Sequence, residues 1–176
     1  MLKRKVQDAI NDQIQRELES AYIYLSMAAY FDTVNLPGFA HWMKVQFQEE
    51  QAHAFKFYDF VSDRGGQVLL QAIGQPPVKF QSPLAAFEKA LAHEEKITGH
   101  INALYALVTE EKDFSSQSLL QWFIDEQVEE EKNAGDIVDT LKKIGDNYQA
   151  LLMIDRELGQ RQIPAQAGAQ TPPTEL

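Results

Sequence analysis

The strongest constraint in this sequence is a spacing of acidic and polar residues that occurs twice. The two sets share intervals of 33 and 36 positions: Glu17, Glu50 and His53, then Glu94, Gln127 and Glu130. Residues three positions apart lie on one face of a helix. The repeat therefore predicts two similar helical hairpins, each with one polar residue on its first helix and two on its second. When the hairpins pack together, these side chains converge on one point inside a four-helix bundle.

The apolar residues support this interpretation, because they recur at intervals of three and four over four long stretches. Pro37-Gly38, Gly65-Gly66 and Gly145 interrupt the pattern, and Ser82-Pro83 is a typical helix start. The predicted helices cover about 3–34, 39–64, 83–112, 115–144 and, as a short amphipathic fifth, 148–158.

The segment 67–81 has no sustained period and contains Gly74, Pro76 and Pro77. It is longer than the usual connection in a compact domain, so it predicts a crossover along the bundle. The expected fold is all-α: a four-helix bundle over 1–145 and a short fifth helix over 146–159. The remainder, 160–176, is rich in Pro, Gln, Ala and Thr and is expected to be a flexible tail.

Each candidate ligand interrupts the middle of an apolar stripe, as Glu17 does between Ile14 and Ala21. Glutamates in helices usually face solvent, but several carboxylates buried together repel one another and lose hydration worth several kcal/mol per ion. A purely hydrogen-bonded polar layer would have too few donors for four carboxylates, one imidazole and one amide. Bound divalent cations offset both costs, so the pattern predicts a metal site inside the bundle.

Oxygen ligands with a single histidine favour iron or manganese over zinc or copper. Glu17, Glu50 and His53 are the predicted ligands of one metal. Glu50, Glu94 and Glu130 are the predicted ligands of the other. Two metals a few Å apart can each give one electron to O2 or peroxide.

Further residues border the predicted centre. Glu49 and Glu126 precede Glu50 and Gln127 by one position, so they point toward one flank, where they form either a third, more exposed cation site or a solvated acidic face. Tyr24 lies two turns after Glu17 and is either a core tyrosine or a one-electron donor to the metals.

Composition narrows the classes of function. The chain has 26 acidic and 16 basic residues, a formal charge of −10, which argues against nucleic acid or an anionic membrane surface as partner. Without cysteine, disulfides, thiolate metal sites and iron–sulfur clusters are excluded. No apolar stretch approaches the roughly 20 residues of a membrane span, and Gln7 and Asp8 stand where a signal peptide needs apolar residues. A cytoplasmic protein is expected.

The chain resembles the non-haem bacterial and archaeal ferritins over about 3–158. The segments that carry the resemblance are RELESAYIYLSMAAYF, GFAHWMKVQFQEEQAHAFKF, SPLAAFEKAL with HEEKI, and QWFIDEQVEEEKNAGDI. The resemblance implies an up-down-down-up bundle with a short fifth helix. It also implies a homo-oligomeric, usually 24-subunit, hollow shell that oxidises Fe(II) and stores a ferric mineral.

The resemblance also implies roles for individual residues. It implies that the five predicted ligands form a ferroxidase centre that binds two irons, with Gln127 nearby. Glu49, Glu126 and Glu129 match the third iron site of prokaryotic ferritins, and Tyr24 matches the tyrosine beside the di-iron centre. Haem is not expected, because Gln51 stands where bacterioferritins have a haem-ligating Met.

Two other functions remain alternatives at this stage. One is a small di-metal oxidoreductase or peroxide scavenger that does not store mineral, and the other is a structural bundle without metal. The sequence leaves open whether O2 or H2O2 is the oxidant and whether a shell would be closed or open.

Overall fold

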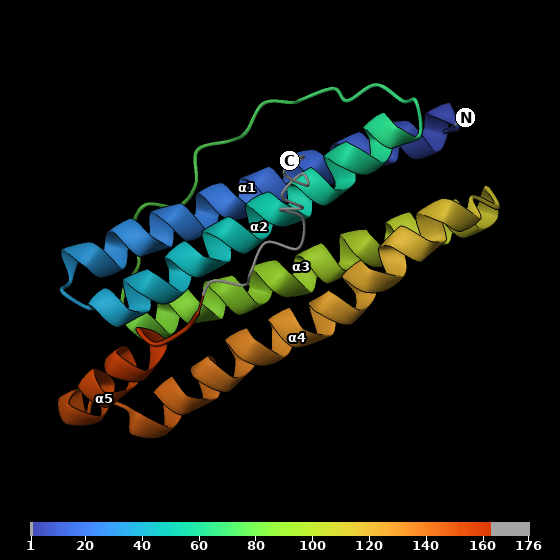
Figure 1. Ribbon diagram of the computed structural model, residues 1–176. Helices are drawn as coiled ribbons and strands as arrows, with labels where there is room; N and C mark the ends of the chain where they lie inside the picture. The colour runs from blue at the N-terminus through green and yellow to red at the C-terminus, as the bar shows by residue number, and fades with distance from the viewer. Residues whose placement is uncertain (1, 163–176) are drawn as a thin grey trace, which may run out of the picture.

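Five α-helices form the regular structure of residues 2–162, the part of the chain described by the computed structural model (Figure 1). They are α1 (Arg4–Thr33), α2 (Pro37–Asp63), α3 (Pro83–Glu110), α4 (Phe114–Ile144) and α5 (Tyr148–Leu158). The predicted all-α fold with a short fifth helix is confirmed. Most of the expected flexible tail, 163–176, lies outside the described residues.

The connections give the bundle its topology. α1 packs against α2 and α3 against α4, each as an antiparallel hairpin, while α1 also contacts α3. The segment between α2 and α3 runs back along the outside of the bundle, so α2 and α3 point the same way (Figure 1). The up-down-down-up order and the long crossover are therefore as expected. Within the described residues, no helix is both long and apolar enough to cross a membrane.

Local signals explain where several helices begin and end. The Ser82 hydroxyl accepts a hydrogen bond from the amide of Ala85, and Pro83 stands at the start of α3. Asp113 caps α4 in the same way, through the amide of Ser116. α4 ends at Gly145, whose φ of 53° is a conformation that glycine adopts without strain.

The start of α2 depends on α5. α2 begins at Pro37, slightly before the predicted start at Phe39. The carboxylate of Asp155 accepts hydrogen bonds from the amides of Gly38 (2.8 Å) and Phe39 (3.1 Å), which are otherwise unpaired donors at the helix N-terminus. A Cβ at position 38 would lie 1.6 Å from the Asp155 carbonyl oxygen, so this contact requires glycine.

Two apolar clusters occupy the two ends of the bundle and leave its middle to polar side chains. The cluster near α5 contains large aromatic residues from three helices, among them Phe31, Phe39 and Phe87. The cluster at the opposite end includes Phe57 and Phe123, whose rings stack 4.0 Å apart. Both clusters use residues from all four long helices, so they hold the two hairpins together on either side of the polar layer.

Candidate metal centre

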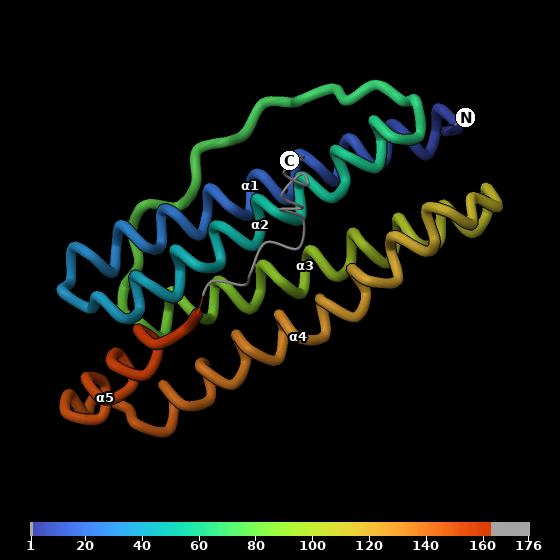
Figure 2. Tube along the Cα trace, in the orientation of Figure 1, coloured from blue at the N-terminus to red at the C-terminus, as the bar shows by residue number. Residues whose placement is uncertain are grey.

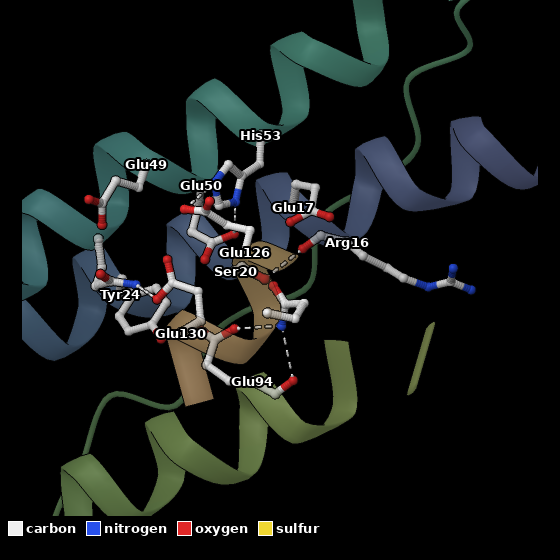
Figure 3. A network of polar contacts seen from close by, with 12 residues as sticks. Arg16, Glu17, Ser20, Tyr24, Glu49, Glu50, His53, Glu94, Glu126 and Glu130 are labelled. Atoms are coloured by element: carbon white, nitrogen blue, oxygen red, sulfur yellow. Dashed lines mark hydrogen bonds and ion pairs between the residues drawn. The ribbon is translucent and has the colours of Figure 1, made fainter. Parts of the chain in front are cut away.

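Carboxylates and one imidazole from all four long helices meet in the middle layer (Figure 3). Within residues 2–162, two groups have potential ligand atoms that all lie within 4.8 Å of one another. They are Glu17 with Glu50 and His53, and His53 with Glu126 and Glu130. Every residue in these groups is buried except Glu126, which is intermediate. The repeat in the sequence therefore does bring its first set, Glu17, Glu50 and His53, together in space.

The first group is only partly satisfied by the protein's own hydrogen bonds. The amide of Gln13, one turn earlier on α1, donates to Glu17 at 2.7 Å. His53 Nδ1 lies 3.6 Å from Glu50 Oε2, beyond hydrogen-bond range, and that oxygen is buried without a hydrogen-bond partner in the described chain. A buried acceptor that lacks a donor is costly, and a cation between these groups would supply what is missing.

The second predicted set, Glu50, Glu94 and Glu130, is arranged differently. Glu94 accepts hydrogen bonds from the Tyr24 hydroxyl and, at 3.4 Å, from the amide of Gln127. Glu130 instead lies with His53 and Glu126, and it accepts a hydrogen bond of 2.8 Å from the Gln46 amide. Glu94 is as deeply buried as the others but is turned toward its donors on α1 and α4.

Burial raises the pKa of each of these carboxyl groups. It raises the pKa of Glu17 from 4.5 to about 7 and that of Glu130 from 4.5 to about 8, and neighbouring carboxylates add to the rise. Burial also holds the pKa of Glu50 well above its usual range, and the charges of Glu94, Glu17 and Glu130 raise it further. Near neutral pH the metal-free cluster therefore retains protons that a bound cation would expel.

His53 has the opposite response to burial. Removal from water lowers its pKa from 6.5 to about 4, and the charge of Lys56 contributes in the same direction. The imidazole is therefore neutral at physiological pH, which is the form that binds metals. The rings of Phe123 and Trp122 border it at centroid distances of 5.8 and 5.4 Å.

The predicted flank residues, Glu49, Glu126 and Glu129, lie beside the centre and differ in how far they are exposed to solvent. Glu126 Oε1 lies 3.9 Å from His53 Nε2, while Glu129, one turn of α4 from it, is exposed. Burial raises the pKa of Glu49 to about 7, and the charges of Glu126 and Glu129 add to this although Arg161 opposes it. The three carboxylates are therefore close enough to influence one another, and Glu126 links them to the buried groups.

Comparison with known proteins agrees with this architecture. Residues 7–144, which span the four long helices and the centre between them, match the family described as a ferritin-like domain. The chain belongs to the ferritin family. It is 42% identical to a bacterial non-heme ferritin of Bacteroides fragilis over 161 residues, which covers 92% of this chain and 100% of that protein. A bacterial non-heme ferritin of Staphylococcus aureus is 37% identical over the same length, with 92% and 97% covered.

Solved ferritins share the fold of this ferritin closely. An open-pore ferritin from the hyperthermophilic archaeon Archaeoglobus fulgidus superposes with a TM-score of 0.91 at 51% identity, over 92% of this chain and 100% of that chain. A closed form of that protein, engineered by site-directed mutagenesis, gives 0.92 at 50% identity over 93% and 99%. The resemblance to non-haem ferritins inferred from the sequence is confirmed.

Some residues around the centre of this ferritin were not assigned a role from the sequence. Gln13 and Gln46 each donate to a buried carboxylate, and Gln46 lies on the apolar stripe of α2, which was the available signal. His93, which precedes Glu94 on α3, forms a hydrogen bond of 2.7 Å with Ser20 of α1. Arg161 contacts Glu49 from the segment after α5, and no pattern in the sequence pointed to that contact.

Proposed function

We propose that this ferritin stores iron and oxidises Fe(II) at the cluster in the middle of its bundle. Glu17, Glu50 and His53 would bind one Fe(II), and Glu50, Glu94 and Glu130 the other, with Gln127 and Tyr24 beside the second. The observation that carries this proposal is the group of buried carboxylates around a neutral histidine. One carboxylate oxygen of this group, Oε2 of Glu50, has no hydrogen-bond partner among residues 2–162. Glu94 would have to turn from Tyr24 toward the metal as iron binds.

The chemistry follows from the ligand set. Each bound Fe(II) gives one electron, and the pair reduces O2 to H2O2 with two protons, or H2O2 to two waters with two protons. Carboxylates stabilise Fe(III) more than Fe(II) because they carry negative charge, so the buried ligand set favours oxidation. The protons displaced from Glu17, Glu50 and Glu130 as iron binds are available within the same site.

The product needs a way out of the centre and a place to accumulate. We propose that Glu49, Glu126 and Glu129 form a third iron site beside the pair, since Glu126 already lies in one ligand group with His53 and Glu130. We further propose that copies of the chain assemble into a hollow shell, expected to have 24 subunits, that holds the ferric mineral. Both the curated relatives and the solved neighbours are named as ferritins, one as an open-pore form, which supports this arrangement.

The direct test is the variant Glu50→Ala, since both irons would lose a ligand. Mixed with Fe(II) in air, it should lose the fast phase of oxidation, with the initial rate at least about 100-fold lower. The matched control is Glu95→Ala, which removes an exposed carboxylate next to Glu94 on α3 and should oxidise iron like the unaltered protein. Unchanged kinetics in Glu50→Ala would refute the assignment of the centre.

Storage is tested separately by loading. The protein is given many equivalents of Fe(II) in air and passed through a sizing column, and iron that elutes with protein is measured. Many irons per chain in a large particle would support storage in a shell. About two irons per chain in a small oligomer would instead indicate a di-metal oxidoreductase without mineral.

A further inference from the structure

Arg161 brings a positive charge to the edge of the acidic cluster. Residues 159–162, the described segment after α5, lead from the end of that helix back toward α2 (Figure 2). There the Arg161 guanidinium donates from Nη2 to Glu49 Oε2 at 2.7 Å, with 19% and 13% of the two side chains exposed. Glu49 is therefore paired with a cation that belongs to the protein itself.

Two further contacts hold Arg161 in this position. Its guanidinium carbon lies 4.5 Å from the centre of the Trp42 ring, a cation–π distance, on the same helix as Glu49. Its backbone carbonyl lies 2.7 Å from Nε2 of His41. The arginine is thus fixed by its main chain, its stacking and its charge, which distinguishes it from the exposed ion pairs on the surface.

The pairing of Arg161 is nevertheless incomplete. Its Nη1 atom is buried and has no hydrogen-bond partner within the described chain. A guanidinium offers five donors in a rigid plane, so an unused buried donor means that its surroundings do not fully satisfy it. The guanidinium is therefore bound to Glu49, one of the three carboxylates that a metal ion on this flank would need.

We propose that Arg161 is a built-in counter-ion that competes with iron for Glu49 and so determines how tightly a third cation binds. This inference rests on the proposed function, because it concerns the flank of the centre defined by Glu49, Glu126 and Glu129. In the metal-free protein the guanidinium neutralises Glu49. A cation that binds Glu49 must displace it, since a positive ion and the guanidinium repel each other at the same oxygens.

The competition has a functional consequence. A flank that bound iron as tightly as the buried pair would retain Fe(III) instead of passing it on. Because Arg161 can return to Glu49 when the ion leaves, each departing ion is replaced by a charge already tethered beside the site. Binding at the flank is therefore weak and reversible. Among the described residues, the guanidinium of Arg161 donates to Glu49 and to no proposed ligand of the buried pair.

The main experiment is a calorimetric titration of the metal-free protein with Zn2+, which binds carboxylate and imidazole without being oxidised. The variant Arg161→Gln should bind the third Zn2+ about tenfold more tightly than the unaltered protein, as expected for the loss of one charge-assisted hydrogen bond. Arg161→Lys, which retains the charge, should stay close to the unaltered protein. The matched control Arg156→Gln removes an exposed charge from α5 and should leave the third step unchanged.

Trp42 offers a readout that a purely structural role would not affect. The chain has two tryptophans, and Trp122→Phe leaves Trp42 as the one reporter. In that background the Trp42 emission should change as the third Zn2+ displaces the guanidinium, and the change should be absent when Arg161→Gln is added. Circular dichroism and sizing chromatography verify that each variant is folded and assembled.

The outcomes separate the two proposals. A third step that is unchanged or weaker in Arg161→Gln, with the first two steps intact, would overturn the role of Arg161 and leave the centre standing. If the unaltered protein does not show the first two Zn2+-binding steps, the proposed function itself is overturned. A third step that tightens in Arg161→Gln and disappears when Glu49→Gln is added is the expected result.

Discussion

The buried carboxylates make a prediction that runs against ordinary expectation, namely that removing one of them stabilises the metal-free protein. The clearest case is Glu17→Gln, because Glu17 is almost fully buried and glutamine has nearly the same shape as the protonated acid. Gln13 can still donate to the amide oxygen at this position, as it now does to the carboxylate. The substitution therefore changes the capacity to ionise and little else.

The size and sign of the effect follow from the pKa of Glu17. Burial raises that pKa from 4.5 to about 7, which corresponds to on the order of 3 kcal/mol. The folded chain keeps this proton at pH values where the unfolded chain has released it. The free energy of unfolding is therefore highest below about pH 4.5 and falls as the pH rises through about 7. Glutamine has no such dependence, so the variant should match the unaltered protein at pH 5 and exceed it at pH 8.

Differential scanning calorimetry of the assembled, chelator-treated protein at pH 5 and pH 8 measures this effect. At about 2–4 °C per kcal/mol for a chain of this size, Glu17→Gln should melt roughly 10 °C higher than the unaltered protein at pH 8 and about equally at pH 5. The exposed Glu95→Gln is the matched control and should shift neither value.

Addition of Zn2+ should reverse the order at pH 8. The metal stabilises the protein that binds it more tightly, and Glu17→Gln has lost a ligand. The reasoning fails if the melting temperature of the unaltered, metal-free protein does not fall between pH 5 and pH 8. It also fails if Glu17→Gln shows the same fall.

Three further predictions concern the centre and the docking of α5. Tyr24→Phe removes the hydroxyl that donates to Glu94, so the fast phase of iron oxidation should slow by about tenfold in stopped-flow absorbance. The control is Tyr22→Phe on the same helix, where the side chain is half-exposed, and it should not slow this phase. The rate of the fast phase should fall as the pH is lowered from 8 to 6. The pKa values of Glu17 and Glu130 are about 7 and about 8, so at lower pH these ligands hold more protons that must leave before iron binds. A rate that does not change with pH would contradict this prediction. Asp155→Ala leaves the amides of Gly38 and Phe39 without their acceptor and should weaken the docking of α5 by about 1 kcal/mol. The amides of α5 should then exchange hydrogen faster than in the control Glu157→Ala, which removes an exposed carboxylate from the same helix. Equal exchange in the two variants would refute the prediction.

Most of the fold could be predicted because its signals are local. Periodicity indicated four long helices, and Ser82 marked the start of α3 through a side chain that caps the amide three positions later. The start of α2 was placed slightly late, since Pro37-Gly38 was interpreted only as an interruption of the helices. Its actual cap is Asp155, more than a hundred positions away, and such a partner is not visible in local sequence.

The centre shows the same division between what a helix face specifies and what tertiary contacts decide. The apolar stripes correctly predicted that Glu17, Glu50, His53, Glu94 and Glu130 are buried. They could not predict the direction of each carboxylate beyond its Cβ. That direction depends on donors from other helices, such as Tyr24 for Glu94 and Gln46 for Glu130.

The layered core explains how the protein can contain a centre that is unfavourable without metal. The apolar clusters on either side each join all four long helices, so the bundle does not depend on the polar layer for its cohesion. Within the layer, Gln13, Gln46 and Gln127 each donate to a carboxylate through a neutral amide, which orients it without supplying a positive charge. A lysine or arginine at those positions would lower the carboxylate pKa values but would also compete with the metal. The described structure instead places the Arg161 guanidinium at Glu49, on the flank. Under the proposed function, this position lets the cation compete with a weakly bound ion and leaves the buried ligands to iron.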